Sequence, residues 1–148
     1  MKILIDGDAC PVKNEIYELA EKYELKVMLV TSVSHYSVTA LPEFVSTVYV
    51  DEGADSADYR IVKLTEAGDI VVTQDYGLAS LVLGKRAVVL HHLGKEYTTV
   101  TIDLMLESRH HNAKVRKSGG RTKGPKKLTA DDRQHFSEKL EDIIKRQL

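Results

Sequence analysis

The chain has 148 residues, 43% of them hydrophobic and 29% charged, and its net charge is −1. This length supports one sizeable core and is short for two, so we expect a single domain over residues 1–148. No apolar run approaches the ~18 residues that span a bilayer, and the opening residues lack the shape of a signal peptide. A lone cysteine excludes a disulfide framework and a cysteine-rich zinc cluster. We therefore expect a cytoplasmic protein with no membrane attachment.

The first half of the chain alternates predicted strands with predicted helices. Its predicted strands are short apolar runs at residues 2–5, 25–30 and 45–50. Apolar residues at helical spacing follow Pro11, which suits the first turn of a helix. After the third strand, a helix is predicted to begin at Asp55 and to end near Gly68.

The second half continues this alternation and ends in a long helix. Two further apolar runs predict strands at residues 70–73 and 87–90, with a short helix between them that ends at Leu83. A helix at about 101–111 is predicted to lead into a basic, flexible loop at about 113–127. The last helix, at about 129–147, has Thr129 as its expected N-cap, with acidic residues in the first turn.

Continuous apolar strands that alternate with helices are typical of parallel strands buried on both faces. We therefore predict a three-layer α/β fold, with a mainly parallel five-stranded sheet of order 3-2-1-4-5 flanked by helices. In such open sheets, ligands bind beyond the carboxyl ends of the strands, at the point where the strand order reverses. This order makes the first and fourth strands neighbours at that point.

Five aspartates are expected at this edge, because they follow the first strand, open the helix before the fourth strand, or follow the fourth strand. Carboxylates brought close together repel one another unless some are protonated or a cation lies between them. Mg²⁺ or Mn²⁺ is the natural cation, since both prefer oxygen ligands and complete their shells with water and phosphate. The predicted metal ligands are Asp6, Asp8, Asp55, Asp58 and Asp75, with Asp6 and Asp75 as the catalytic pair. Such a site would support metal-assisted attack of water on a phosphodiester.

Each of these aspartates also has a purely structural interpretation. The Asp6–Asp8 segment has the composition of a turn. Asp55 and Asp58 suit the first turn of their helix, and Asp75 suits the N-cap of the next one. The metal interpretation is favoured by the joint placement of three separate segments at one edge of the sheet.

The charge is distributed unevenly along the chain. Residues 1–108 hold nine Lys and Arg against 17 Asp and Glu, whereas residues 109–127 hold eight Lys and Arg and no acid. A Gly-rich basic segment suits phosphate backbones and would offset the repulsion between an acidic site and a polyanion, although a solvated connector is an alternative. We predict nucleic acid, in particular RNA, as the partner. The expected contacts are Lys114, Arg116, Lys117, Arg121, Lys123, Lys126 and Lys127.

Other polar residues give weaker signals. The loop after the second strand lies on the ligand side of the sheet, and its candidate substrate contacts are Ser34, His35 and Ser37. The histidines lack the spacing of a helical zinc site. Cys10 has no partner arrangement for a thiol enzyme and is expected to be a packing residue.

Four motifs give the chain a resemblance to a known family. They are Ile5–Pro11 (IDGDACP), Gly53–Asp58 (GADSAD), Thr73–Ala79 (TQDYGLA) and Arg121–Pro125 (RTKGP). With these motifs the chain resembles, over nearly its whole length, the YaiI/YqxD family of bacterial proteins, which is grouped with the PIN-like nucleases. The resemblance implies a PIN-like α/β fold and Mg²⁺- or Mn²⁺-dependent ribonuclease chemistry. It assigns the acidic roles to Asp6, to Asp55 or Asp58, and to Asp75.

The expected function is therefore that of a divalent-metal-dependent nuclease acting on RNA, and two other functions stay open. A nucleic-acid-binding or regulatory module without catalysis would use the same basic segment. A haloacid-dehalogenase-like phosphohydrolase would use Asp6 and Asp8 as nucleophile and acid, with Thr73 as its hydroxyl residue, but its lysine and cap domain are not evident. Association between copies of the chain is left open.

Overall fold

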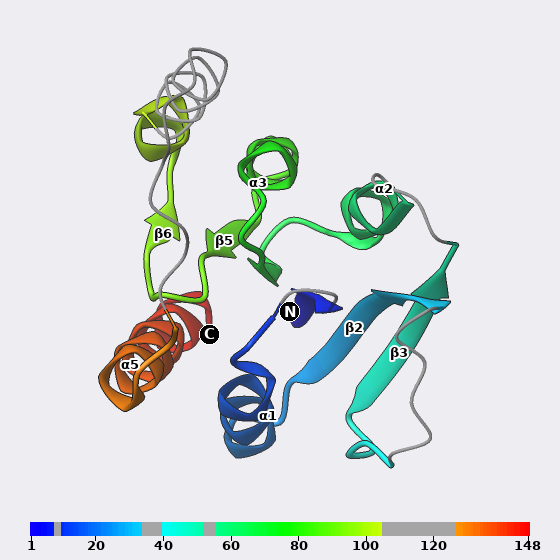
Figure 1. The fold of residues 1–148 in the computed structure, drawn as a ribbon, viewed down its shortest axis with the longest axis vertical. Helices are drawn as coiled ribbons and strands as arrows, with labels where there is room; N and C mark the ends of the chain where they lie inside the picture. The colour runs from blue at the N-terminus through cyan, green and yellow to red at the C-terminus, as the bar shows by residue number, and fades with distance from the viewer. Residues whose placement is uncertain (8–9, 34–39, 52–55, 105–126) are drawn as a thin grey trace.

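The computed structural model describes residues 1–7, 10–33, 40–51, 56–104 and 127–148 (Figure 1). One sheet runs through it in the strand order β3-β2-β1-β4-β5-β6. The strands are β1 (Lys2–Asp6), β2 (Lys26–Ser32), β3 (Val45–Val50), β4 (Ile70–Val72), β5 (Val88–Leu90) and β6 (Glu96–Tyr97). The first five strands pair in parallel, which confirms the predicted order 3-2-1-4-5.

The sheet has a sixth strand beyond the five predicted from the sequence. β6 pairs antiparallel with β5 after a tight turn, in which the Gly94 N–H donates to the His91 carbonyl at 2.9 Å. Gly94 has φ +88°, and a Cβ there would lie 2.5 Å from Cδ2 of His135, so this position requires glycine. A strand of two residues carries no period-two pattern, and for this reason periodicity could not reveal it.

Helices cover both faces of the sheet and make the three predicted layers. They are α1 (Lys13–Lys22), α2 (Ser56–Leu64), α3 (Tyr76–Leu83) and α5 (Ala130–Gln147). α1 and α5 lie on one face, and α2 and α3 lie on the other (Figure 1). Residues 99–104 are also helical; the rest of the helix predicted at 101–111 lies outside the described residues. None of the helices in the described part of the chain is long and apolar enough to cross a membrane.

Alternation along β1 divides the core into two clusters. Ile3 and Ile5 pack toward α1 and α5, whereas Leu4 packs toward α2 and α3. The apolar stripe of α5 is completely buried. Burial of each such side chain stabilises the folded state by about 1.5–3 kcal/mol. The buried residues of α5 are Phe136, Leu140, Ile143 and Ile144. Its predicted N-cap is confirmed, because Thr129 and Asp132 form a reciprocal capping box.

Gly7, directly after β1, is packed tightly against β2. A Cβ at this position would lie 2.6 Å from the Leu29 Cδ1 atom and 2.9 Å from the Val30 carbonyl oxygen. The second atom belongs to the backbone of a central strand and cannot move aside easily. Glycine is therefore required here by close approach, and it fixes how the chain leaves the strand that ends at Asp6.

We predict that Gly7→Ala lowers the free energy of unfolding by about 1–3 kcal/mol, because the methyl group must displace the backbone of β2. The measurement is urea denaturation followed by circular dichroism. Gly84→Ala is the control, since Gly84 caps α3 with helical φ −62° and tolerates a side chain more readily. Equal unfolding midpoints for Gly7→Ala and the wild type would contradict the packing argument.

Candidate active site at the carboxyl edge of the sheet

A single buried threonine connects the two aspartates predicted to form the catalytic pair. Thr73 follows β4 and is 3% exposed. Its hydroxyl donates to Asp6 Oδ2 at 3.0 Å and accepts the backbone N–H of Asp75 at 3.0 Å. Asp6 ends β1, and the parallel pairing of β1 with β4 confirms the predicted adjacency of the first and fourth strands and brings Asp6 within reach of Thr73. From the sequence, Thr73 is a candidate only for the phosphohydrolase alternative, because its positioning role depends on the contact with Asp6 across the sheet.

Asp75 is also the N-cap of α3. Its backbone is extended, with φ −87° and ψ 114°, and its Oδ1 accepts the N–H of Leu78 at 3.1 Å. The structural interpretation of Asp75 is therefore correct, and it is compatible with a second role because capping uses one carboxylate oxygen. A Cβ on Gly77 would lie 3.2 Å from the same Oδ1 atom, so the small residue leaves room for the carboxylate.

Asp58 and Asp75 share a cavity between α2 and α3. The cavity has a volume of about 560 Å³. Its lining residues are Asp58, Tyr59, Val62, Asp75, Gly77, Leu78, Ser80 and Leu81. Of the predicted ligands in the described part of the chain, Asp58 and Asp75 line this cavity and Asp6 does not. Asp75 is therefore the residue that joins the threonine bridge to the cavity.

The donor chemistry of these side chains fits Mg²⁺ or Mn²⁺, which are bound by a few carboxylates together with waters and substrate phosphate. Two of the predicted ligands, Asp8 and Asp55, lie outside the described residues. Within the described ranges, no group of three or more His, Cys, Asp or Glu is placed to hold a metal ion. In the described part of the site, the Thr73 hydroxyl binds the Asp6 carboxylate, and Asp58 and Asp75 line the cavity.

Asp69 shows how an acidic residue at the opposite edge of the sheet is used. Its carboxylate is buried, and Oδ1 accepts the backbone N–H of Lys2 at 3.1 Å. Oδ2 lies 2.7 Å from Lys2 Nζ and accepts the N–H of Glu66 at 2.9 Å. Asp69 thus fixes the start of β1, and its bonds are those of a structural residue.

The predicted nucleic-acid contacts lie mostly outside the described residues. Those outside are Lys114, Arg116, Lys117, Arg121, Lys123 and Lys126. The candidate substrate contacts Ser34, His35 and Ser37 also lie outside the described residues. Lys127 is described and exposed, just before α5.

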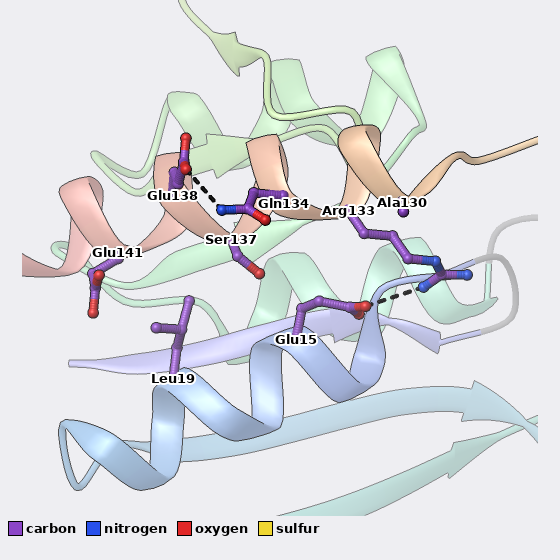
Figure 2. Close-up of a pocket in the computed structure, with 8 residues that line it drawn as sticks. All are labelled: Glu15, Leu19, Ala130, Arg133, Gln134, Ser137, Glu138 and Glu141. Atoms are coloured by element: carbon purple, nitrogen blue, oxygen red, sulfur yellow. Dashed lines mark hydrogen bonds and ion pairs between the residues drawn. The ribbon is translucent and has the colours of Figure 1, made fainter.

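The first turn of α5 is held beside the segment that follows β1. Arg133 Nη1 donates to the Pro11 carbonyl at 2.7 Å and lies 3.2 Å from Oε1 of Glu15. Figure 2 shows this pair across a groove of about 330 Å³ between α1 and α5. The other carboxylate oxygen of Glu15 is buried and has no hydrogen-bond partner within the described chain. Arg133 thus ties the first turn of α5 to the segment between β1 and α1 and to α1 itself.

Aromatic and imidazole rings gather beyond β5. The rings of His91 and His92 lie 4.2 Å apart, and Tyr97 is in edge contact with both His91 and Tyr76. The Tyr97 hydroxyl donates to the Thr73 carbonyl at 3.2 Å, and burial raises the pKa of Tyr97, which keeps this donor protonated. Histidine spacing alone could not reveal the cluster, because the unpredicted hairpin forms it.

Burial, with help from His92 and Lys95, lowers the pKa of His91 from 6.5 to about 4. In the unfolded chain His91 takes up a proton near pH 6.5, while in the folded protein it stays neutral until about pH 4. We predict that stability falls as the pH drops through this window. In urea denaturation at several pH values, the free energy of unfolding of His91→Asn should fall less steeply with decreasing pH than that of the wild type. Part of the pH dependence that remains is due to His92, whose pKa is also lowered by burial. An unchanged slope would contradict this.

Thr73→Val keeps the side-chain volume but removes both hydrogen bonds of the hydroxyl. We expect a loss of about 1–3 kcal/mol in the free energy of unfolding, because buried polar groups are left unpaired. Thr73→Ser should retain most of the stability. Thr65→Val is a matched control, since that buried hydroxyl only adds a second bond to the Ile61 carbonyl. If both valine variants lose the same stability in urea denaturation, Thr73 has no special role.

Comparison with known proteins identifies the family. A family model described as "Uncharacterized BCR, YaiI/YqxD family" matches residues 4–146. The chain is 53% identical to a UPF0178 protein of Enterococcus faecalis over 148 residues, which is 100% of both chains. It is 56% identical to a UPF0178 protein of Bacillus cereus over 144 residues, covering 97% of this chain and 99% of the relative. No solved structure matches it significantly. The chain belongs to the YaiI/YqxD family.

Proposed function

We propose that this protein is a divalent-metal-dependent nuclease that hydrolyses phosphodiester bonds in RNA. The observation that carries the proposal is the Thr73 bridge, which holds Asp6 and the backbone of Asp75 together where the strand order reverses. Ligands of open α/β sheets bind at this point. The PIN-like nucleases, which the family resembles, place their acids in the same order along the chain.

In this proposal each residue of the site has a role in metal binding, in orienting a ligand or in substrate binding. Asp6 and Asp75 would hold the metal, with Asp58, Asp8 and Asp55 as the further ligands that the sequence predicts. A bound Mg²⁺ or Mn²⁺ would supply an activated water and stabilise the leaving oxygen. Thr73 orients the Asp6 carboxylate by donating a hydrogen bond to it. The same hydroxyl accepts the backbone N–H of Asp75 and so fixes the start of α3. The cavity between α2 and α3 receives the substrate next to Asp58 and Asp75.

Charge supports a polyanionic substrate. The eight Lys and Arg of residues 109–127 contrast with the acidic composition of residues 1–108. Arg133 fixes the first turn of α5 beside Pro11, in the segment that follows β1, and Lys127 precedes this helix in the chain. Contacts of this kind bind the phosphate backbone without reading sequence. A single cysteine is in keeping with the reducing cytoplasm, where we place this activity.

We predict that the purified protein cleaves single-stranded RNA when Mn²⁺ or Mg²⁺ is present and not when EDTA removes it. Asp6→Asn and Asp75→Asn should each reduce the cleavage rate by roughly 100-fold or more, since they weaken metal binding while preserving side-chain size. The measurement is the rate of product formation from an end-labelled oligoribonucleotide. Asp142→Asn, at an exposed position of α5, is the matched control and should cleave as the wild type does.

The same assay separates the other functions. Salt-dependent RNA binding without cleavage at any metal concentration would instead support a non-catalytic binding module. Hydrolysis of p-nitrophenyl phosphate without RNA cleavage would instead support the phosphohydrolase. Cleavage that survives Asp6→Asn and Asp75→Asn would contradict the proposed site.

A further inference from the structure

Tyr59 is a large aromatic residue that the core does not use. It lies in the first half of α2, where Ala57 and Ile61 are the buried residues. Its side chain is 72% exposed, the highest exposure among the large hydrophobic residues of the described chain. Isolated exposed apolar residues are common on protein surfaces. The position of Tyr59 beside Asp58 is what makes it informative.

Tyr59 lines two cavities. The first is the cavity of about 560 Å³ that contains Asp58 and Asp75, and its apolar wall includes Leu81, which is itself 57% exposed. The second has a volume of about 280 Å³. Its lining residues are Tyr49, Val50, Asp51, Ser56, Tyr59 and Arg60. Tyr59 therefore separates two adjoining hollows on the surface of α2.

The first cavity combines two kinds of surface that match the two parts of a nucleotide. The carboxylates of Asp58 and Asp75 occupy the part where the proposed metal would meet a phosphate. Tyr59, Val62 and Leu81 offer apolar surface that suits the flat face of a base. The volume lies within the range of small-ligand sites. The second cavity continues the path past Tyr59 toward Arg60, a side chain suited to phosphate, although Asp51 in the same lining offsets part of its charge.

We propose that Tyr59 stacks on a nucleobase of single-stranded RNA and thereby gives the enzyme its preference for unpaired substrate. The inference rests on the proposed function, which supplies the phosphate position at Asp75. Bases in a duplex are already stacked and paired, so only an unpaired base can be splayed out against an aromatic side chain. Stacking on an aromatic residue tolerates any base, so no sequence preference is expected from Tyr59.

The test uses the full chain and a single-stranded oligoribonucleotide that contains 2-aminopurine, whose fluorescence is quenched on stacking. Binding is measured in EDTA, so that cleavage does not interfere. Tyr59→Ala should weaken binding about 10-fold and remove the quench, whereas Tyr59→Phe, which keeps the ring, should retain both. Duplex RNA should bind equally to all three proteins. Val100→Ala, at another exposed apolar position, is the control and should bind single strands as the wild type does.

The outcomes separate this inference from the proposed function. If Mn²⁺-dependent cleavage is observed but Tyr59→Ala binds and quenches the single strand like the wild type, the inference is wrong and the nuclease stands. If no metal supports cleavage but the quench depends on the Tyr59 ring, the stacking site stands and the nuclease is wrong. If Tyr59→Ala lowers the mass in analytical ultracentrifugation without changing RNA binding, the surface joins copies of the chain and the inference is overturned.

Discussion

The hydroxyl of Thr73 is buried just beyond β4, at the carboxyl edge of the sheet, where an unpaired polar group would be costly. It is paired on both sides, with the Asp6 carboxylate on one neighbouring strand and the Asp75 N–H at the start of a helix. The parallel pairing of β1 with β4 brings these groups within reach. Tight packing of Gly7 against β2 fixes the chain on the other side of Asp6. The geometry of the candidate site thus follows from the β1–β4 pairing, the two hydrogen bonds of Thr73 and the close packing of Gly7.

Placement at one edge or the other decides what each acid does. Asp69 precedes β4 and is saturated by hydrogen bonds to Lys2 and Glu66, as a structural residue should be. Asp58 and Asp75 instead line the cavity between α2 and α3. Aspartate therefore has a purely structural role at the amino edge of β4, whereas at the carboxyl edge Asp75 both caps α3 and lines the cavity.

The five parallel strands, their order and the cap of α5 could be predicted, because each leaves a local pattern of apolar residues or capping residues. The predicted strand order also places Asp6 and Asp75 at the same edge of the sheet, and in the structure Thr73 links the Asp6 carboxylate to the Asp75 backbone N–H. The details that depend on contacts between distant segments could not be predicted. The β5–β6 hairpin is too short for a periodic signal, and the cluster of His91, His92 and Tyr97 exists only because of it. The exposure of Tyr59 likewise depends on how α2 packs.

The charge at Asp75 is more than its structural role needs. An asparagine caps a helix as well as an aspartate does, and the favourable effect of a negative charge at an exposed helix N-terminus is only about 0.3–1 kcal/mol. An amide oxygen could likewise accept the hydrogen bond that the Thr73 hydroxyl donates to Asp6. These two hydrogen bonds require oxygen acceptors, and the chain places two carboxylates at this edge although its first 108 residues are already acidic. A cation bound at this edge would neutralise that charge, and this is why the proposed function assigns both carboxylates to the metal.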